Sequence, residues 1–292
     1  MSRAVPFTGR DDGSPLVPDG LDATVVLLRH GESEWIREGR FQGQAESPLS
    51  ALGRRQAALA GERLARPHAS PALPVPGGLP REIAHSPLAR AADTASAVAS
   101  AMADLRVVGE AQATAAPLPV LRAEPGLLEI GQGEWEGVTA DEIGRHWPAE
   151  IAGWRRDPLA VHAPGGESLA EVDARLRPAL ARVLDELGRD YPRGTTDRPQ
   201  VHGYSGAAQA AAQPWSVLVA HDGVFKVVML ALFDLPLAKF WSFSMGLTGI
   251  SVVEFRGGRA VLRAHNWTGH LAPIEDELER EITERRSRSG AL

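Results

Sequence analysis

The sequence predicts an α/β protein, a three-layer α/β/α sandwich around a mostly parallel central sheet. Short runs of aliphatic and β-branched residues alternate along the chain with longer segments in which apolar residues recur every three or four positions. Such alternation of strands and helices favours a parallel sheet with helices on both faces. Of the 292 residues, 43% are hydrophobic and 23% charged, which is ordinary for a globular chain with a sizeable core.

The expected strands are short apolar runs that end near turn residues. Those outside hairpins are TVVLLRH (24–30), EIAHS (82–86), a Pro-flanked segment near 117–122, and SVLVAH (216–221). GISVVEF (249–255) and RAVLRAH (259–265) flank the turn at Arg256-Gly-Gly, which predicts a hairpin.

Helices are expected where apolar residues recur every three or four positions. The expected helices are 49–65, the Ala-rich 87–104, 139–156, 166–187 and 223–235. Ser50 is a suitable N-cap for the first of them. Ser168 and Glu171 have the spacing of a capping box at the start of 166–187.

One main domain is expected, over residues 22–275. Residues 1–21 are rich in Gly, Pro and Asp and predict a flexible tail. The stretch 188–214 has little periodicity and predicts a flexible insertion within the domain. Residues 276–292 predict a charged helix that ends in a tail.

Composition excludes several classes of function. A net charge of −6 argues against a general nucleic-acid binder, and no apolar run reaches the length of a membrane span. The chain has no cysteine, which excludes disulfides, thiolate catalysis and cysteine-bound metals. No signal peptide is apparent, so we expect a cytoplasmic protein. The sequence does not determine whether the chain forms a homo-oligomer.

Three expected strands end in polar side chains. The first ends at Arg29 and His30, the second is followed by Arg90 in the next helix, and the fourth ends at His221. Ligands of α/β sheets bind beyond the carboxyl ends of the strands, so these side chains are expected to converge in one crevice. Arginine binds phosphate oxygens through its planar fork, and a neutral histidine can attack phosphorus. The pattern therefore favours phosphoryl chemistry.

Several segments, in this order, carry a family resemblance. They are RHGESEW, FQGQAESPLSALGRRQA, SPLARAADTA, LLEIGQGEWEG, PGGESL and VLVAHDG. Together they resemble the histidine phosphatase superfamily, in its phosphoglycerate-mutase-like branch, over roughly residues 24–270. The short form GQGEWEG resembles the phosphatase subgroup. The resemblance implies a phosphoglycerate-mutase-like fold and phosphatase activity on a small phosphorylated metabolite.

The resemblance also implies roles for particular residues. His30 would be the nucleophile that becomes phosphohistidine, while Arg29 and Arg90 hold the phosphoryl oxygens and His221 completes the pocket. Glu129 would protonate the leaving oxygen and then activate the attacking water. No metal or other cofactor is expected, because arginines and imidazoles supply the positive charge.

Four further positions bear on the resemblance. Arg40 and Gln42 match a loop that lines the phosphate or substrate entrance. Ile36 stands where the family often has an asparagine that contacts phosphate, and Gln42 is a candidate replacement donor. Asp222 stands where glycine is common, and its carboxylate would repel an anion unless it points away.

Alternatives remain open at this point. Glu134 is the rival of Glu129 as the acid, while His85 and Ser86 are expected to be structural, with Ser86 capping the next helix. The alternative functions are a phosphoglycerate mutase and a catalytically weak phosphate-binding regulatory module. The substrate is not determined, and its specificity is expected to lie in the loops at 66–81, 106–126, 157–167 and 188–214.

Overall fold

The computed structural model describes residues 14–107, 117–189 and 213–277. Within them, six strands form one sheet in the order β3-β2-β4-β1-β5-β6. The strands are β1 (Ala23–Arg29), β2 (Glu82–His85), β3 (Val120–Ala123), β4 (Trp215–Ala220), β5 (Ile250–Arg256) and β6 (Arg259–Trp267). The neighbours from β3 to β1 are parallel, and β5 and β6 add an antiparallel hairpin. The predicted mostly parallel α/β fold is confirmed.

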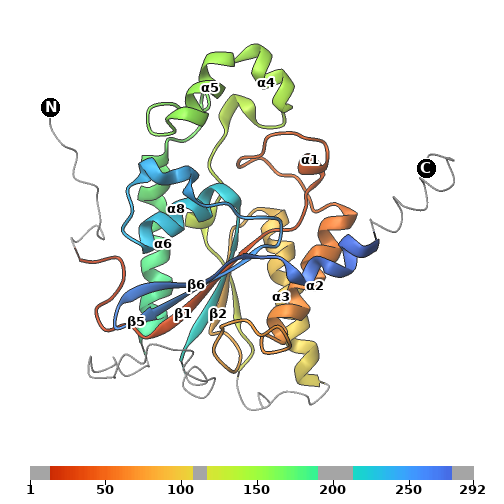
Figure 1. Cartoon of the computed structure of the whole chain (residues 1–292), viewed down its shortest axis with the longest axis vertical. Helices are drawn as coiled ribbons and strands as arrows, with labels where there is room; N and C mark the ends of the chain where they lie inside the picture. The colour runs from red at the N-terminus through yellow and green to blue at the C-terminus, as the bar shows by residue number, and fades with distance from the viewer. Residues whose placement is uncertain (1–13, 108–116, 190–212, 278–292) are drawn as a thin grey trace, which may run out of the picture.

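Helices cover both faces of the sheet (Figure 1). On one face lie α2 (Ala51–Ala65) and α3 (Ala89–Val107), and on the other α6 (Leu169–Gly188) and α8 (Asp222–Leu232). The helices α4 (Ala140–His146) and α5 (Pro148–Arg156) stand above the sheet in Figure 1. The remaining helical segments are short: α1 (Glu34–Arg37), η1 (Pro125–Leu127), η2 (Gly133–Trp135), η3 (Leu237–Ser242) and η4 (Gly269–Leu271).

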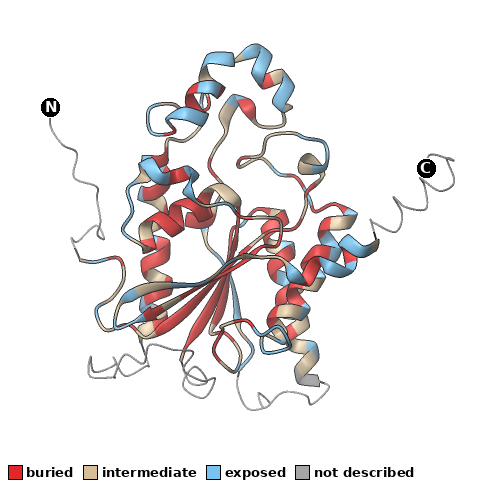
Figure 2. Ribbon diagram, in the orientation of Figure 1, coloured by how far each residue is buried: buried red, intermediate tan, exposed pale blue. Residues whose placement is uncertain are grey.

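The core consists of two apolar layers, one on each face of the sheet (Figure 2). Successive side chains of a strand point to opposite faces. Along β1, Val25 and Leu27 therefore join the layer under α6 and α8, while Val26 and Leu28 join the layer under α2 and α3. A strand covered on both faces needs a continuous apolar run, which is why 24–30 lacks polar alternation.

The helix starts follow the local sequence. Ser50 caps α2 by accepting a hydrogen bond from the backbone N–H of Gly53, and Ser168 forms the expected capping box at α6 with Glu171. The segment 139–156, expected to be helical, forms two helices, α4 and α5, with a break at Trp147. Pro148 disfavours a helical backbone in the residue before it and has no N–H to continue the ladder.

Replacement of Ser168 by alanine is expected to lower the free energy of unfolding by about 1 kcal/mol, because the N–H of Glu171 in the first turn of α6 loses its side-chain acceptor. Chemical unfolding in urea measures this change. Ser168→Thr is the matched control, since threonine keeps the hydroxyl that accepts from the N–H of Glu171 and donates to its carboxylate. An alanine variant as stable as the wild type would show that the cap does not stabilise α6.

The described part of the expected N-terminal tail packs onto the domain. Leu16 and Leu21 are each only 3% exposed, and the Leu21 carbonyl accepts a hydrogen bond of 2.8 Å from Gly258. This differs from the flexible tail expected over 1–21, because the hairpin β5–β6 offers contacts that no local pattern reveals. Almost all of the expected insertion at 188–214 and of the C-terminal segment 276–292 lies outside the described residues.

The loop at 66–81 leads into the start of β2, below the sheet in Figure 1. The backbone N–H of Arg81 donates to the carbonyl of Trp215, where β4 begins, over 2.8 Å. This loop therefore lies at the amino ends of the parallel strands. Because ligands of such sheets bind beyond the carboxyl ends of the strands, this position argues against the expected role of the loop in substrate specificity.

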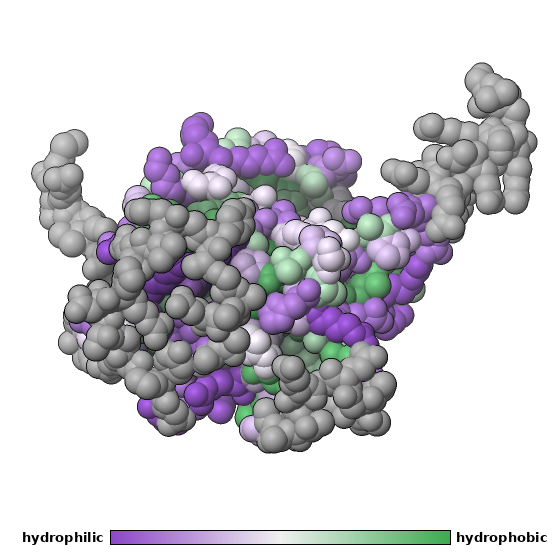
Figure 3. All heavy atoms as spheres, turned by 60° about the horizontal axis from the view of Figure 1, so that its bottom comes forward, coloured by the Kyte–Doolittle hydropathy of each residue, from purple (hydrophilic) through white to green (hydrophobic). Residues whose placement is uncertain are grey.

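The third strand, β3, is exposed along its whole length. Two of its side chains, Val120 and Leu121, are large, apolar and exposed, as is that of Leu118 just before it. On the face that Figure 3 presents, hydrophilic residues surround smaller apolar areas wherever grey atoms do not cover it. The short, exposed β3 agrees with a strand expected from a Pro-flanked segment.

Candidate active site

Three neighbouring strands end at one edge of the sheet and bring their following residues together. The backbone N–H of His30, after β1, donates to the carbonyl of Ala220 in β4 over 3.0 Å. The N–H of Ser86, after β2, donates to Val219 of the same strand over 2.9 Å. Because β4 lies between β2 and β1, His221 at its end stands between the other two strand ends.

The imidazole rings of His30 and His221 are in contact, with centroids 5.0 Å apart and an angle of 61° between their planes. Nδ1 of His30 lies 2.6 Å from the carbonyl oxygen of Gly31. A carbonyl only accepts, so Nδ1 carries the hydrogen, and Nε2 of the neutral ring keeps its lone pair. Nε2 of His221 lies 2.8 Å from Oγ of Ser86, while its buried Nδ1 has no partner among the described residues.

Burial and the charges of two nearby arginines lower the pKa of both imidazole rings. Burial lowers the pKa of His30 well below its usual value, and the charges of Arg29 and Arg90 lower it further. Burial likewise lowers the pKa of His221, with further lowering by Arg90, His30 and Arg29. Both rings are therefore neutral near neutral pH. We call Arg29, His30, Arg90 and His221 the histidine–arginine cluster.

Backbone carbonyls hold both arginines. Nη1 of Arg29 donates to Met245 over 2.6 Å, and Arg90 donates to Gly43 over 2.7 Å and to Ala45 over 3.2 Å. Burial lowers the pKa of each guanidinium, although both stay charged. Neither forms an ion pair with a described carboxylate, and the buried Nε of each has no partner there. A bound oxyanion would satisfy these charges and donors.

Glu129 lies beside the cluster, at the start of α8. Its carboxylate accepts hydrogen bonds from the N–H groups of Ile130 over 2.9 Å, Val224 over 3.0 Å and Gly223 over 3.3 Å. The last two belong to the first turn of α8, where N–H groups lack intrahelical partners. A Cβ atom on Gly223 would come within 2.6 Å of this carboxylate, so the close approach requires glycine.

Opposing effects act on the acidity of Glu129. Burial raises its pKa and the charge of Asp222 adds to the rise, while the N–H of Ile130, the charge of Arg90 and the N–H of Gly223 lower it. The net effect is a raised pKa, which suits a proton donor. The rival carboxylate, Glu134, is exposed to solvent on η2.

The carboxylate of Asp222 is neutralised by Lys226, whose Nζ lies 2.6 Å from Oδ2. Oδ1 accepts a hydrogen bond of 3.0 Å from the N–H of Met245, and the carbonyl of this residue in turn holds Arg29. The repulsion of an anion that the sequence suggests is thereby reduced. Asp222 instead supports the backbone that orients an arginine.

Replacement of Asp222 by alanine is expected to raise KM about tenfold, which corresponds to about 1.4 kcal/mol and is near the lower end of what a hydrogen bond to a charged group contributes. The reason is that Met245 loses its anchor and Arg29 its fixed orientation. Steady-state kinetics measure the change. The control Asp222→Asn keeps an oxygen acceptor and is expected to lose less. A fall in KM for the alanine variant would mean that repulsion dominates.

The described hydrogen bonds of Arg40 and Gln42 are made with residues outside the histidine–arginine cluster. Nη1 of Arg40 donates to the carbonyl of Gly137 over 2.7 Å, and its side chain is 39% exposed. Nε2 of Gln42 donates to Oγ of Ser33, the N-cap of α1. None of these hydrogen bonds joins either side chain to the histidine–arginine cluster. A substrate-binding role for the pair stays a prediction.

The residues expected to be structural are placed as follows. His85 is buried, with Nδ1 at 2.8 Å from the carbonyl of Ser86. Oγ of Ser86 accepts from the N–H of Leu88 over 3.4 Å and also contacts His221. Ser86 therefore serves both the turn into α3 and the orientation of an imidazole.

Sequence reasoning missed the role of Glu136. Its carboxylate accepts hydrogen bonds from the N–H groups of Gln44 over 2.9 Å, Ala45 over 2.7 Å and Gln132 over 2.9 Å. It thereby fixes the loop whose carbonyls hold Arg90. No local pattern marks the contacts with Gln44 and Ala45, because these residues lie 92 and 91 positions earlier in the chain.

Across residues 14–107, 117–189 and 213–277, no group of three or more His, Asp or Glu side chains is arranged to hold a metal ion. The helices within these ranges include none with the length and apolar character that crossing a bilayer requires.

Comparison with known proteins agrees with the geometry. The model of the histidine phosphatase superfamily (branch 1) matches residues 25–191 and 203–268. The chain is 30% identical over 258 residues to phosphoserine phosphatase 1 of Hydrogenobacter thermophilus, covering 88% of this chain and 99% of that protein. It is 32% identical over 238 residues to glucosyl-3-phosphoglycerate phosphatase of Mycobacterium tuberculosis, covering 80% of this chain and 85% of that protein.

A solved structure is similar as well. It is a mycobacterial glucosyl-3-phosphoglycerate phosphatase in complex with VO3, with a TM-score of 0.62 and 28% identity. The match covers 84% of this chain and 98% of that one.

Proposed function

Because the chain belongs to branch 1 of the histidine phosphatase superfamily and is a phosphatase, we propose that it hydrolyses a small phosphate monoester through a phosphohistidine on His30, without a metal ion. The observation that carries the proposal is the neutral His30 ring, with Nε2 unprotonated, beside two buried guanidinium groups that lack an ion-pair partner among the described residues.

In the first step the lone pair of His30 Nε2 attacks phosphorus, and the bond from phosphorus to the leaving oxygen breaks. Arg29 and Arg90 hold the non-bridging oxygens, whose charge grows in the transition state. Protonated Glu129 gives its proton to the leaving oxygen, so that an alcohol departs and a carboxylate remains. The raised pKa of Glu129 supports this role.

In the second step water attacks the phosphorus of the phosphohistidine. The carboxylate of Glu129 takes a proton from the water, and the electron pair of the phosphorus–nitrogen bond returns to Nε2 of His30. Inorganic phosphate leaves, and Glu129 is again protonated for the next cycle. The buried guanidinium charges would supply the positive charge that a metal ion supplies in other phosphatases.

The proposed substrate is a phosphate ester of an aliphatic alcohol that also carries a carboxylate. This description fits the compounds in the names of both relatives, phosphoserine and glucosyl-3-phosphoglycerate. Phosphoserine, 3-phosphoglycerate and phosphorylated sugar acids are therefore the first compounds to assay, ranked by kcat/KM.

Phosphate release from p-nitrophenyl phosphate in excess chelator tests the proposed function. Continued turnover is expected, together with an acid-labile phosphoenzyme that is stable to alkali after rapid quenching, as a phosphorus–nitrogen bond requires. Loss of turnover on chelation would end the metal-independent mechanism, and an acid-stable phosphoenzyme would end the role of histidine.

Phosphoglycerate mutase is the alternative to hydrolysis. An assay with 3-phosphoglycerate and a trace of 2,3-bisphosphoglycerate separates the two functions. Isomerisation faster than phosphate release would replace the proposed phosphatase by a mutase. The short GQGEWEG segment after Glu129 favours hydrolysis.

A further inference from the structure

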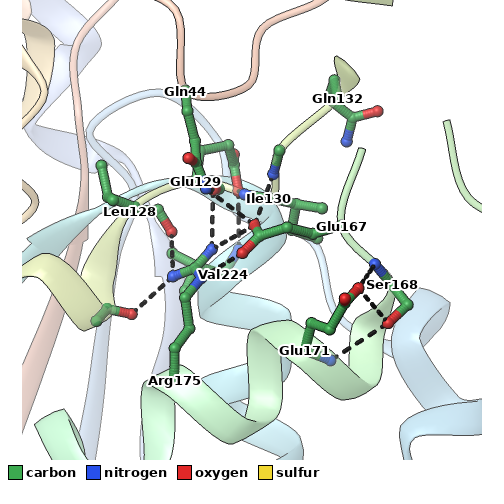
Figure 4. Close-up of polar contacts among 12 residues, drawn as sticks. Gln44, Leu128, Glu129, Ile130, Gln132, Glu167, Ser168, Glu171, Arg175 and Val224 are labelled. Carbon is green, nitrogen blue, oxygen red and sulfur yellow. Dashed lines mark hydrogen bonds and ion pairs between the residues drawn. The ribbon is translucent and has the colours of Figure 1, made fainter. Parts of the chain in front are cut away.

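The loop that carries Glu129 is held by an arginine of α6. Arg175 donates hydrogen bonds to three backbone carbonyls of this loop (Figure 4). The acceptors are the carbonyls of Gly126 at 2.9 Å, Leu128 at 3.0 Å and Glu129 at 2.9 Å. These bonds reach the main chain of Glu129 and not its carboxylate, which remains free to contact α8.

Glu167 completes this arrangement from the residue before the N-cap of α6. Its two oxygens accept from Nε of Arg175 at 2.8 Å and from Nη2 at 2.9 Å. One of them also accepts from the N–H of Gly131 at 2.8 Å and from the amide of Gln44 at 2.9 Å. The Gln44 amide donates at 3.1 Å to the carbonyl of Glu129 as well. Figure 4 shows these side chains converging on the loop.

All five N–H donors of the Arg175 guanidinium are used, two on Glu167 and three on the loop. Lysine has three donors around a point charge and cannot reproduce this planar arrangement. Burial works to raise the pKa of Glu167, but hydrogen bonds from Arg175 and Gly131 outweigh it and the net pKa is lowered. Glu167 is therefore ionised and remains a strong acceptor near neutral pH.

We propose that Arg175, oriented by Glu167, is a positioning residue that fixes the main chain around Glu129, so that this side chain meets the leaving oxygen of the substrate. The inference rests on the proposed role of Glu129 as general acid. Arg175 touches neither the substrate nor the phosphoryl oxygens in this scheme. In this scheme Arg175 acts on protonation of the leaving group and activation of water, while its charge also contributes to the lowered pKa of His221. The lysine variant keeps that charge and so tests the positioning role by itself.

The positioning role has a kinetic signature. A poor leaving group, such as an alkoxide, needs the proton from Glu129, whereas p-nitrophenolate leaves with little help. Because kcat/KM reports the steps up to departure of the leaving group, misplacement of Glu129 should lower it for alkyl phosphates far more than for p-nitrophenyl phosphate. Binding of inorganic phosphate at the histidine–arginine cluster should not change.

The test compares Arg175→Lys and Glu167→Gln with the wild type on p-nitrophenyl phosphate and on phosphoserine. For Arg175→Lys we expect kcat/KM to fall about 100-fold on the alkyl substrate, the loss typical of a 1 Å misplacement. On the aryl substrate we expect a fall of less than about fivefold, since departure of a good leaving group needs little general acid. The inhibition constant of inorganic phosphate should stay within about twofold, because the arginines that bind it are intact.

Arg177→Met is the matched control, because Arg177 lies on the same helix and pairs with Asp173 over 2.7 Å instead of with the loop. Its kinetics should equal those of the wild type on both substrates. Equal losses on the two substrates, or no loss on phosphoserine, would overturn the positioning role of Arg175. If Arg175→Lys does not fold, Glu167→Gln, which keeps the shape of the side chain, decides the question.

Failure of the inference can be told apart from failure of the proposed function by Glu129→Gln in the same assay. If that variant is selectively poor on phosphoserine and the Arg175 variant is not, only the positioning role is lost. If Glu129→Gln itself shows no dependence on the leaving group, the proposed acid is wrong.

Discussion

Replacement of His30 by alanine is expected to lower kcat about 10⁴-fold or more, because loss of a nucleophile leaves only the catalysis due to binding and electrostatics. The geometry of the ring supports its role as the nucleophile. The Nδ1 hydrogen is engaged by the carbonyl of Gly31, and Nε2 is left with its lone pair beside the rings and charges of the cluster. Rapid-quench labelling with radioactive substrate should find no acid-labile phosphoenzyme in the variant.

Two controls accompany the His30 variant. Phosphate should still raise the melting temperature of His30→Ala, because Arg29 and Arg90 remain, and ligand binding to the native state stabilises it. His68→Ala should keep wild-type kcat, since His68 lies in the 66–81 loop, with Nε2 at 2.8 Å from the carbonyl of Val75. A His30→Ala enzyme with more than about a tenth of wild-type kcat would contradict nucleophilic catalysis by this ring.

Replacement of Glu129 by glutamine is expected to lower kcat/KM for an alkyl phosphate by about 10²–10⁴-fold, the usual contribution of general acid–base catalysis. Glutamine keeps the size of the side chain and one oxygen acceptor, which can serve the N–H groups of Ile130 and Val224, so only the longer bond from Gly223 is lost and the fold should persist. Steady-state kinetics with phosphoserine measure the effect. Glu134→Gln, a change at the exposed neighbouring carboxylate, is the matched control. The opposite ranking of these two variants would assign the acid to Glu134.

The pH profile follows from the same groups. Catalysis requires a neutral His30, whose pKa is lowered by burial and by the arginines, so kcat/KM should fall only when pH drops below this lowered pKa. It also requires protonated Glu129, whose pKa is raised by burial, so kcat/KM should fall as pH rises above that value. Activity is therefore expected on the acid to neutral side. In Glu129→Gln the fall toward alkaline pH should be lost, and its persistence would show that another group causes it.

The strand ends could be predicted from sequence because they follow from local rules. A continuous apolar run such as 24–30 predicts a buried strand, and such strands deliver their next residues to one edge of a parallel sheet. This places His30 and His221 on neighbouring strands, as observed in the 5.0 Å contact of their rings. Ser168 with its capping box and the hairpin at Arg256 were predictable for the same reason.

Other features depend on contacts that no local pattern records. Arg175 binds the carbonyl of Glu129 across 46 positions, and Glu136 binds Gln44 across 92. The partners in these bonds are mostly main-chain groups, which every residue has, so the side-chain types around them give no indication. Asp222 is the clearest case, since the sequence suggests repulsion and the structure places Lys226 against its carboxylate.

The sequence by itself determined the fold class, the order of strands and helices along the chain, and the residues that gather at the carboxyl ends of the strands. It could do so because apolar period and strand-end position are local properties. Only the tertiary structure decided which carbonyls orient Arg29 and Arg90, how Asp222 is neutralised, and that Arg175 and Glu167 hold the loop of Glu129. The physical reason is that hydrogen bonds to the main chain depend on where the backbone passes, and this is set by packing of the whole domain.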